Sequence, residues 1–176
     1  MKRVISSTLF VLIMAMHGSS SAHCEIPCGI YGDEARFMAI AENLNTIEKS
    51  MKEIVRLSAD VPIKASTRDG MQMQVITMTR NSADAYKNFN LLVRWVNNKE
   101  MHADQIREIV AQYFLAQRIK APANDDPTAG KAYSDKLALL HQMIVSAMKC
   151  KQTTDTAHVR KSRELLQAFE ALYMKK

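Results

Sequence analysis

The fold is decided first by residues 37–55, which read FMAIAENLNTIEKSMKEIV. Apolar residues recur here mostly at steps of three and four, the period that places them along one face of an α-helix. That face consists of Phe37, Ile40, Ala41, Leu44, Ile47, Met51, Ile54 and Val55. Asp33 precedes the stripe as a candidate N-cap, and Asp60-Val61-Pro62 ends it. We therefore expect an amphipathic helix over about Glu34–Ser58.

Further helical stripes follow along the chain. One runs from Val75 to Val96 and another from Met101 to Ile119, with Asn97-Asn98 between them. Because Asn side chains compete for backbone hydrogen bonds, the pattern predicts either two helices or one long helix bent near Asn97. The residues before Val75, from Ile63 to Gly70, are expected to be a connector.

Two more helices complete the pattern. Apolar stripes of helical period lie in Leu137–Met148 and Val159–Tyr173, with a break at Gln152–Asp155. Ala121–Gly130 contains two prolines and an Asn-Asp-Asp cluster and is expected to be a loop. We find no alternation of period two that is long enough to predict a strand. The sequence therefore predicts an all-α protein, an up-down four-helix bundle of residues 32–176 with an N-terminal metal-binding hook.

Residues 1–22 have the pattern of a cleaved secretory signal peptide. Two basic residues precede the mostly apolar run Val4–Met16, and small residues lead to Ala22. Removal of 22 of the 176 residues leaves 154, and the formal net charge falls from +6 to +4 because the leader holds two basic and no acidic residues. Basic and acidic residues are interleaved elsewhere, so nucleic-acid binding is not indicated. No later apolar run approaches the ~18 residues of a membrane span, so we expect a soluble exported protein, periplasmic or extracellular.

The leader is followed by His23-Cys24-Glu25-Ile26-Pro27-Cys28-Gly29-Ile30-Tyr31, a hook region of residues 23–31. Cleavage after the leader makes His23 the N-terminus, so its α-amine and the Cys24 amide nitrogen can close a five-membered chelate. The sulfurs of Cys24 and Cys28 complete a plane of two nitrogens and two sulfurs, and the His23 imidazole is left as an axial donor. Square-planar coordination favours Ni(II) or Cu(II) over tetrahedral Zn(II). Pro27 restricts the turn between the thiols, and Gly29 allows a backbone reversal after them.

Other potential metal ligands have simpler interpretations. The twelve methionines fit the irregular gaps of a helical core. His102, His141 and His158 each lack a second His or a carboxylate at metal-binding helical spacing, so we expect surface or hydrogen-bonded histidines. Cys150 is the third cysteine and is expected to be a spare thiol.

The hook region resembles the nickel hook of nickel-containing superoxide dismutases, which reads His-Cys-x-x-Pro-Cys-Gly-x-Tyr at a processed N-terminus. All fixed positions of that motif are matched by residues 23–31. The resemblance implies that one nickel ion per subunit is bound by the amine and imidazole of His23, the amide nitrogen and thiolate of Cys24, and the thiolate of Cys28. It implies that Tyr31 orders water or substrate beside the metal. The implied reaction is disproportionation of superoxide to dioxygen and hydrogen peroxide, with nickel alternating between Ni(II) and Ni(III), in a hexamer of helical bundles.

One departure from the family concerns Val61–Asn81, because compact members lack so long a stretch after the first helix. We expect either an insertion or a helix extension there. Two other functions stay open at this point. One is an exported nickel- or copper-binding helical protein without turnover, and the other is a helical interaction module with a Cys24–Cys28 disulfide.

Overall fold

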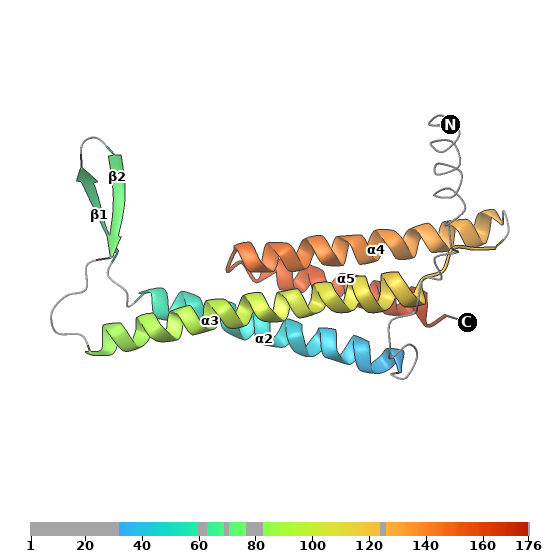
Figure 1. The fold of residues 1–176 in the computed structure, drawn as a ribbon, viewed down its shortest axis with the longest axis horizontal. Coiled ribbons are helices and arrows are strands. Elements are labelled where there is room, and N and C mark those ends of the chain that lie inside the picture. The colour runs from blue at the N-terminus through green and yellow to red at the C-terminus, as the bar shows by residue number, and fades with distance from the viewer. Residues whose placement is uncertain (1–31, 60–62, 69–70, 77–82, 124–125, 176) are drawn as a thin grey trace, which may run out of the picture. The chain divides into compact units, whose positions relative to one another are not determined.

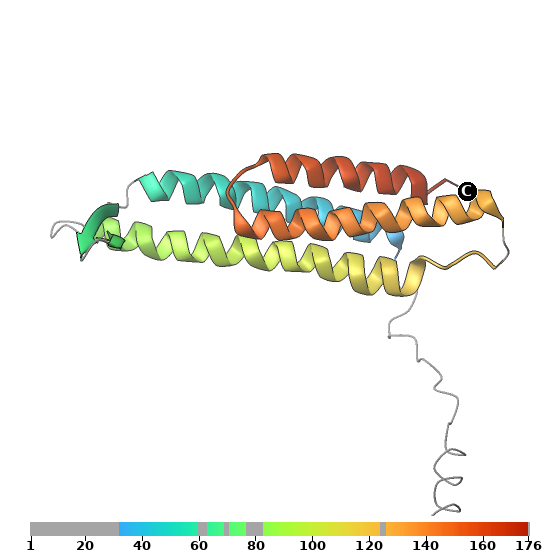
Figure 2. The ribbon, with the colours of Figure 1, turned by 90° about the horizontal axis from the view of Figure 1, so that it is seen from above.

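The described part of the chain contains a bundle of helices that run side by side, with consecutive helices pointing in opposite directions (Figures 1 and 2). The computed structural model describes residues 32–59, 63–68, 71–76, 83–123 and 126–175. The helices are α2 (Asp33–Ala59), α3 (Ala83–Glu108) continued by the π-helix η1 (Ile109–Arg118), α4 (Pro127–Gln152) and α5 (Ala157–Tyr173). α2 packs against α3 and α5, and α4 packs against the same two helices. The predicted all-α, up-down four-helix bundle is confirmed.

The first helix buries the stripe that the sequence predicts. α2 extends one residue beyond the predicted Glu34–Ser58 at each end. Six of the eight stripe residues are buried, Ala41 packs partly against the core, and Val55 is exposed. Asp33 is the first residue of the helix rather than its N-cap, and its side chain contacts other helices.

The second helix passes through Asn97-Asn98 without a break. The side-chain amide of Asn98 donates a hydrogen bond to Ser50 Oγ on α2 at 3.0 Å, and Ser50 Oγ donates to the Thr46 carbonyl at 2.8 Å. Asn98 therefore has a partner on another helix and does not compete for its own backbone. The structure thus agrees with one long helix, although Ile109–Arg118 has π-helical hydrogen bonding.

Aromatic rings fill the core at the end of the bundle where α2 begins. Phe114 of η1 is fully buried, and its ring centroid lies 5.1 Å from Phe37, 5.2 Å from Tyr113, 5.0 Å from Phe169 and 5.6 Å from Tyr173. The last three pairs are edge-to-face, a geometry that adds about 0.5–1.5 kcal/mol per pair beyond area burial. This aromatic cluster joins α2, η1 and α5 at the end that follows the hook region in sequence.

A β-hairpin lies between α2 and α3 in the chain. β1 (Ile63–Arg68) pairs antiparallel with β2 (Met71–Ile76). The predicted connector before Gly70 is therefore wrong, and so is the start of the second helical stripe at Val75, which lies in β2. The later part of that stripe, Ala85 to Val96, is helical and lies in α3. The hairpin is neither a plain loop nor a helix extension. Two sequence signals indicate it: Asp69-Gly70 is a strong two-residue turn pair, and the Met-Gln-Met-Gln run of β2 alternates with strand period.

The third helix begins inside the segment that the sequence assigns to a loop. Asp126 accepts a hydrogen bond from the Thr128 backbone N–H at 2.9 Å, and Pro127 occupies the first helical position. Pro is well suited there because its fixed φ is helical and its missing N–H has no partner to lose. The predicted loop at Ala121–Gly130 is therefore shorter at its C-terminal end.

A buried lysine holds the C-terminal end of α4. Lys99 of α3 is 4% exposed, and its ammonium donates to the carbonyls of Lys151 and Thr153, the latter at 3.1 Å. The last carbonyls of a helix lack intrahelical partners and carry partial negative charge, so a cation is stabilising there. The pKa of Lys99 is lowered because burial disfavours its charged form. The predicted break near Gln152–Asp155 is confirmed, since α5 begins at Ala157.

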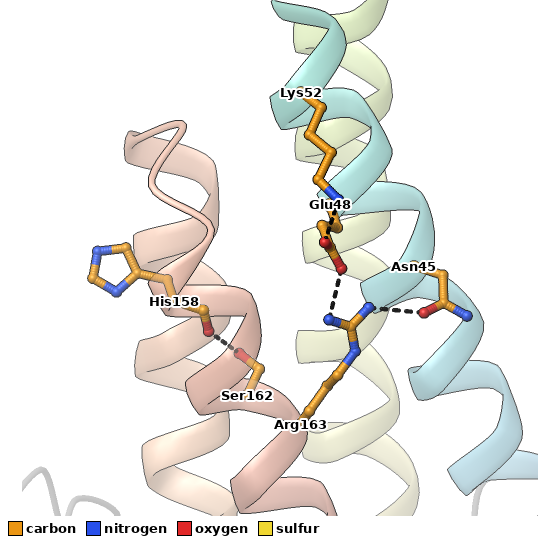
Figure 3. A network of polar contacts seen from close by, with 6 residues as sticks. All are labelled: Asn45, Glu48, Lys52, His158, Ser162 and Arg163. Atoms are coloured by element: carbon orange, nitrogen blue, oxygen red, sulfur yellow. Dashed lines mark hydrogen bonds and ion pairs between the residues drawn. The ribbon is translucent and has the colours of Figure 1, made fainter. Parts of the chain in front are cut away.

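A charged network also ties α5 to the middle of α2 (Figure 3). The guanidinium of Arg163 donates to Glu48 Oε2 at 2.7 Å and to Asn45 Oδ1 at 2.8 Å, and Lys52 donates to Glu48 Oε1 at 2.6 Å. Hydrogen bonds from Lys52 and Arg163 lower the pKa of Glu48. We call these four residues the Glu48 network.

Replacement of Phe114 by alanine tests the aromatic cluster. We expect the free energy of unfolding to fall by about 3–5 kcal/mol, because a fully buried ring is lost and a cavity remains. Urea unfolding followed by circular dichroism measures the change. Met38→Ala is the control, since that side chain is 64% exposed, and a Phe114→Ala cost as small as that of Met38→Ala would contradict the role of the cluster.

Candidate metal centre

The predicted nickel ligands lie outside the described residues. His23, Cys24 and Cys28, together with Tyr31, precede Gly32, the first residue that the structure describes. The donor set therefore rests on the chemistry of the sequence. Two thiolates, an amide nitrogen, an amine and an imidazole suit a square-planar Ni(II) with an axial nitrogen.

The described residues offer no competing metal site. No group of three or more His, Cys, Asp or Glu lies close enough to hold a metal ion in this part of the chain. Cys150 is a buried free thiol, and its pKa is raised mainly by burial. His102 is half-buried, and its Nδ1 shares a hydrogen bond with Asn43 Oδ1 on α2. The hydrogen bond of His102 agrees with the expectation of a surface or hydrogen-bonded histidine.

Directly after the hook region, the carboxylate of Asp33 binds three side chains from two other helices. Its Oδ1 accepts from the Tyr113 hydroxyl at 2.7 Å. Its Oδ2 accepts from the Arg118 guanidinium at 2.8 Å and from the Tyr173 hydroxyl at 2.9 Å. Arg118 Nε also donates to the Tyr173 oxygen at 3.2 Å. We call these four residues the Asp33 network, and it links the start of α2 to η1 and α5.

The π-helical geometry of η1 explains how two of its residues reach one carboxylate. Tyr113 and Arg118 are five positions apart. In an α-helix such residues are rotated about 140° from each other, because each residue adds about 100°. In a π-helix, whose hydrogen bonds run i→i+5, each turn contains more residues, so residues five apart lie closer to one face than they do in an α-helix. The Ile119 backbone N–H follows this pattern and donates to the Phe114 carbonyl at 2.9 Å.

Cations stack on the aromatic members of the network. The Arg36 guanidinium, one turn into α2, lies 5.0 Å from the centroid of the Tyr113 ring, and the Arg118 guanidinium lies 5.8 Å from it. The Lys136 ammonium lies 5.9 Å from the Tyr173 ring centroid. Contacts of this kind contribute about 0.5–1 kcal/mol each at exposed sites and more when desolvated. The first turn of α2 is therefore held to η1 by both Asp33 and Arg36.

The pKa values of the network keep its donors and acceptor in the required states. Partial burial alone would raise the pKa of Asp33, but hydrogen bonds from Arg118, Tyr113 and Tyr173 outweigh it and lower that pKa. Burial, with the hydrogen bond to Asp33, raises the pKa of Tyr113 to about 12, and burial raises the pKa of Tyr173. At neutral pH the carboxylate is therefore ionised and both hydroxyls keep the protons that they donate.

A cationic cavity adjoins the Asp33 network. It has a volume of about 390 Å³ and is lined by Arg118, Lys120, Lys136 and the two tyrosines Tyr133 and Tyr173, among other residues. The lining includes three cations and no carboxylate. A cavity with this charge attracts small anions.

Sequence reasoning did not identify the Asp33 network. Tyr113 and Tyr173 lie in the predicted apolar stripes, and the sequence predicts Asp33 as a helix N-cap. The predicted stripes do place both tyrosines on inward faces, but only the π-helix brings Arg118 to the same point. The apolar pattern of Ile109–Arg118 predicts a helix but does not distinguish a π-helix from an α-helix.

Together, the fold and the donor-rich stretch before it define a helical-bundle metalloprotein. A family model described as nickel-containing superoxide dismutase matches residues 18–176, which include the whole hook region and all four helices of the bundle. The chain belongs to the nickel-containing superoxide dismutase family: it is an oxidoreductase that acts on superoxide, and nickel is its cofactor. Comparisons with curated proteins and with solved structures gave no match. No helix among the described residues is long and apolar enough to cross a membrane.

The Asp33 network predicts a dependence of stability on pH. The pKa of Asp33 is lower in the folded chain than its ordinary value of 3.8, so the folded state binds fewer protons. The stabilisation is complete above the ordinary value and is lost as the pH falls through the lowered pKa. At pH 7 we expect Asp33→Asn to lower the free energy of unfolding by about 1–3 kcal/mol. The difference from wild type should shrink as the pH is lowered from 5 to 3, measured by urea unfolding. A constant difference over that range would show that the Asp33 charge is not the source.

Proposed function

We propose that this superoxide dismutase binds its nickel in the hook region, through His23, Cys24 and Cys28. The observation that carries the proposal is the nine-residue motif at residues 23–31, which lies inside the segment matched by the family model. The two thiolates and the amide nitrogen are anionic donors, and each loses a proton when it binds metal, so nickel uptake should weaken as the pH falls. When bound, nickel supplies one-electron exchange by alternating between Ni(II) and Ni(III).

The residues of the chain then have separate tasks. The thiolates of Cys24 and Cys28 and the backbone nitrogens of His23 and Cys24 would hold the nickel and favour its higher oxidation state, and the His23 imidazole would supply a further nitrogen donor. Tyr31 orders water or substrate beside this donor set. Lys120 and Lys136, the cations of the cavity beside the Arg118–Asp33 ion pair, attract the superoxide anion to the bundle end where α2 begins. Two superoxide anions and two protons give one dioxygen and one hydrogen peroxide.

Removal of residues 1–22 is part of this proposal. The backbone nitrogen of His23 belongs to a peptide bond until the leader is cut after Ala22. In that form it cannot serve as the terminal amine donor. The leader pattern also supports export, to a periplasmic or extracellular location. The N-terminal sequence of the exported protein should therefore begin at His23.

A homohexamer is the oligomeric state that we propose from the resemblance of the hook region to the family motif. The described surface carries exposed apolar side chains on several helices, including Met38 on α2, Val93 and Met101 on α3, and Met148 on α4. Such side chains are available for contacts between subunits. Light scattering of the processed, nickel-loaded protein measures the number of chains per particle.

A one-residue extension before His23 tests the ligand set. We expect the extended protein to lose at least about 100-fold in superoxide turnover and in nickel affinity, because outer-shell changes alone cost 10–100-fold and here a ligand is lost. Nickel content and turnover are measured on the processed protein. Cys150→Ser is the control, since that thiol is buried and distant in sequence from the hook, and it should retain its nickel.

Each other function predicts a different result in the same experiment. Nickel or copper bound without superoxide turnover would indicate a metal carrier. A Cys24–Cys28 disulfide that persists after metal loading would indicate an interaction module. Full activity of the extended protein would contradict ligation by the His23 amine.

A further inference from the structure

We propose that Asp33 is a positioning residue for the nickel site, because it fixes the residue at which the hook region joins the bundle. This inference rests on the proposed function, since it takes the hook region as the place where nickel is bound. Asp33 is five residues after the proposed ligand Cys28 and is the first residue of α2. Because an extended chain spans at most about 3.6 Å per residue, the position of Asp33 limits how far Cys28 can lie from the start of α2.

The contacts of Asp33 are those of an anchor between helices. Both carboxylate oxygens are engaged, and the three donors come from η1 and α5 at distances between 2.7 and 2.9 Å. Only 19% of the Asp33 side chain is exposed, and the Arg118 side chain is 34% exposed. Hydrogen bonds to ionised groups are about twice as strong as those between neutral groups, and several on one carboxylate define its position.

Aromatic rings pack closely beneath this anchor. Phe37, Phe114, Phe169 and Tyr173 pack against one another under the first turn of α2. The Arg36 guanidinium covers the Tyr113 ring from the same turn. The start of α2, η1 and the C-terminal end of α5 lie at one end of the bundle in both views (Figures 1 and 2). The anchor therefore connects three helices at the first residue of α2, two residues after the hook region in the sequence.

A fixed base matters because five donor atoms, all from residues 23–28, must converge on one nickel ion when it binds. Ordering a loop on binding costs free energy, and holding one end of it beforehand reduces that cost. Metal and catalytic sites also need supporting residues whose own positions are locked by packing and hydrogen bonds. Loss of the Asp33 charge in Asp33→Asn would leave one neutral amide oxygen where two carboxylate oxygens now accept three hydrogen bonds.

The Glu48 network provides a matched control within the same helix (Figure 3). Glu48 also lies on α2, is also bound by an arginine of another helix at 2.7 Å, and is 26% exposed. It stands fifteen residues beyond Asp33 in the chain. Glu48→Gln therefore removes a comparable charge and interhelical contact without touching the start of α2.

The experiment compares processed, full-length wild type, Asp33→Asn and Glu48→Gln. Amide hydrogen exchange of residues 29–36 is measured without nickel, and nickel affinity is measured by chelator competition. We expect Asp33→Asn to exchange at least about tenfold faster in this segment and to bind nickel about 10–100-fold more weakly. Glu48→Gln should match wild type in both measurements. Circular dichroism checks that each variant is folded, and Asp33→Glu should recover part of the lost affinity.

The outcomes separate this inference from the proposed function. Unchanged exchange of residues 29–36 in Asp33→Asn would overturn the anchoring role, whether or not the wild type binds nickel. An equal loss of nickel affinity in Glu48→Gln and Asp33→Asn would overturn it as well, because a general loss of stability would then suffice. Absence of nickel binding by the wild type would instead contradict the proposed function.

Discussion

The aromatic cluster at the start of α2 is the constraint on which the rest of this bundle end depends. Phe114 is fully enclosed by rings from α2, η1 and α5, so these helices cannot shift separately without opening a cavity. Tyr113 and Tyr173 belong to this aromatic cluster, and their hydroxyls lie at its edge. There both hydroxyls meet the carboxylate of Asp33. Packing and charge therefore fix the same point, which is Asp33, the first residue of α2.

In this arrangement, the helices that form the bundle and the residues proposed to bind nickel are separate parts of the chain. The bundle supplies a fixed base and a set of cations, whereas the donor atoms that suit nickel lie in nine residues before it. Away from this site, at the C-terminal end of α4, the buried cation of Lys99 donates hydrogen bonds to two helix-terminal carbonyls. Membership of the nickel-containing superoxide dismutase family agrees with a scaffold that contains no three-ligand group among its described residues.

The helices could be predicted from sequence because their apolar stripes have the period of 3.6 residues over many turns. The bounds of α2 differ from the prediction by one residue at each end, and the break before α5 follows from polar residues. The hairpin was not predicted because its strands are only six residues long and half of their residues are polar. Val75 was therefore assigned to the helical stripe that follows. The continuity through Asn97-Asn98 depends on Ser50 of another helix, which no local pattern shows.

The proposed metal ligands were predicted from donor chemistry and from the hook motif, whereas the Asp33 network was not predicted. In the sequence, Asp33 has the pattern of an ordinary helix cap. The local pattern of Ile109–Arg118 does not predict the π-helix, in which Tyr113 and Arg118 both reach Asp33. The central claim is that residues 23–28 hold nickel through sulfur and nitrogen. X-ray absorption at the nickel edge of the processed protein tests it most directly. The account predicts two sulfur scatterers with nitrogen donors around the metal, and a shell of oxygen and nitrogen without sulfur would contradict it.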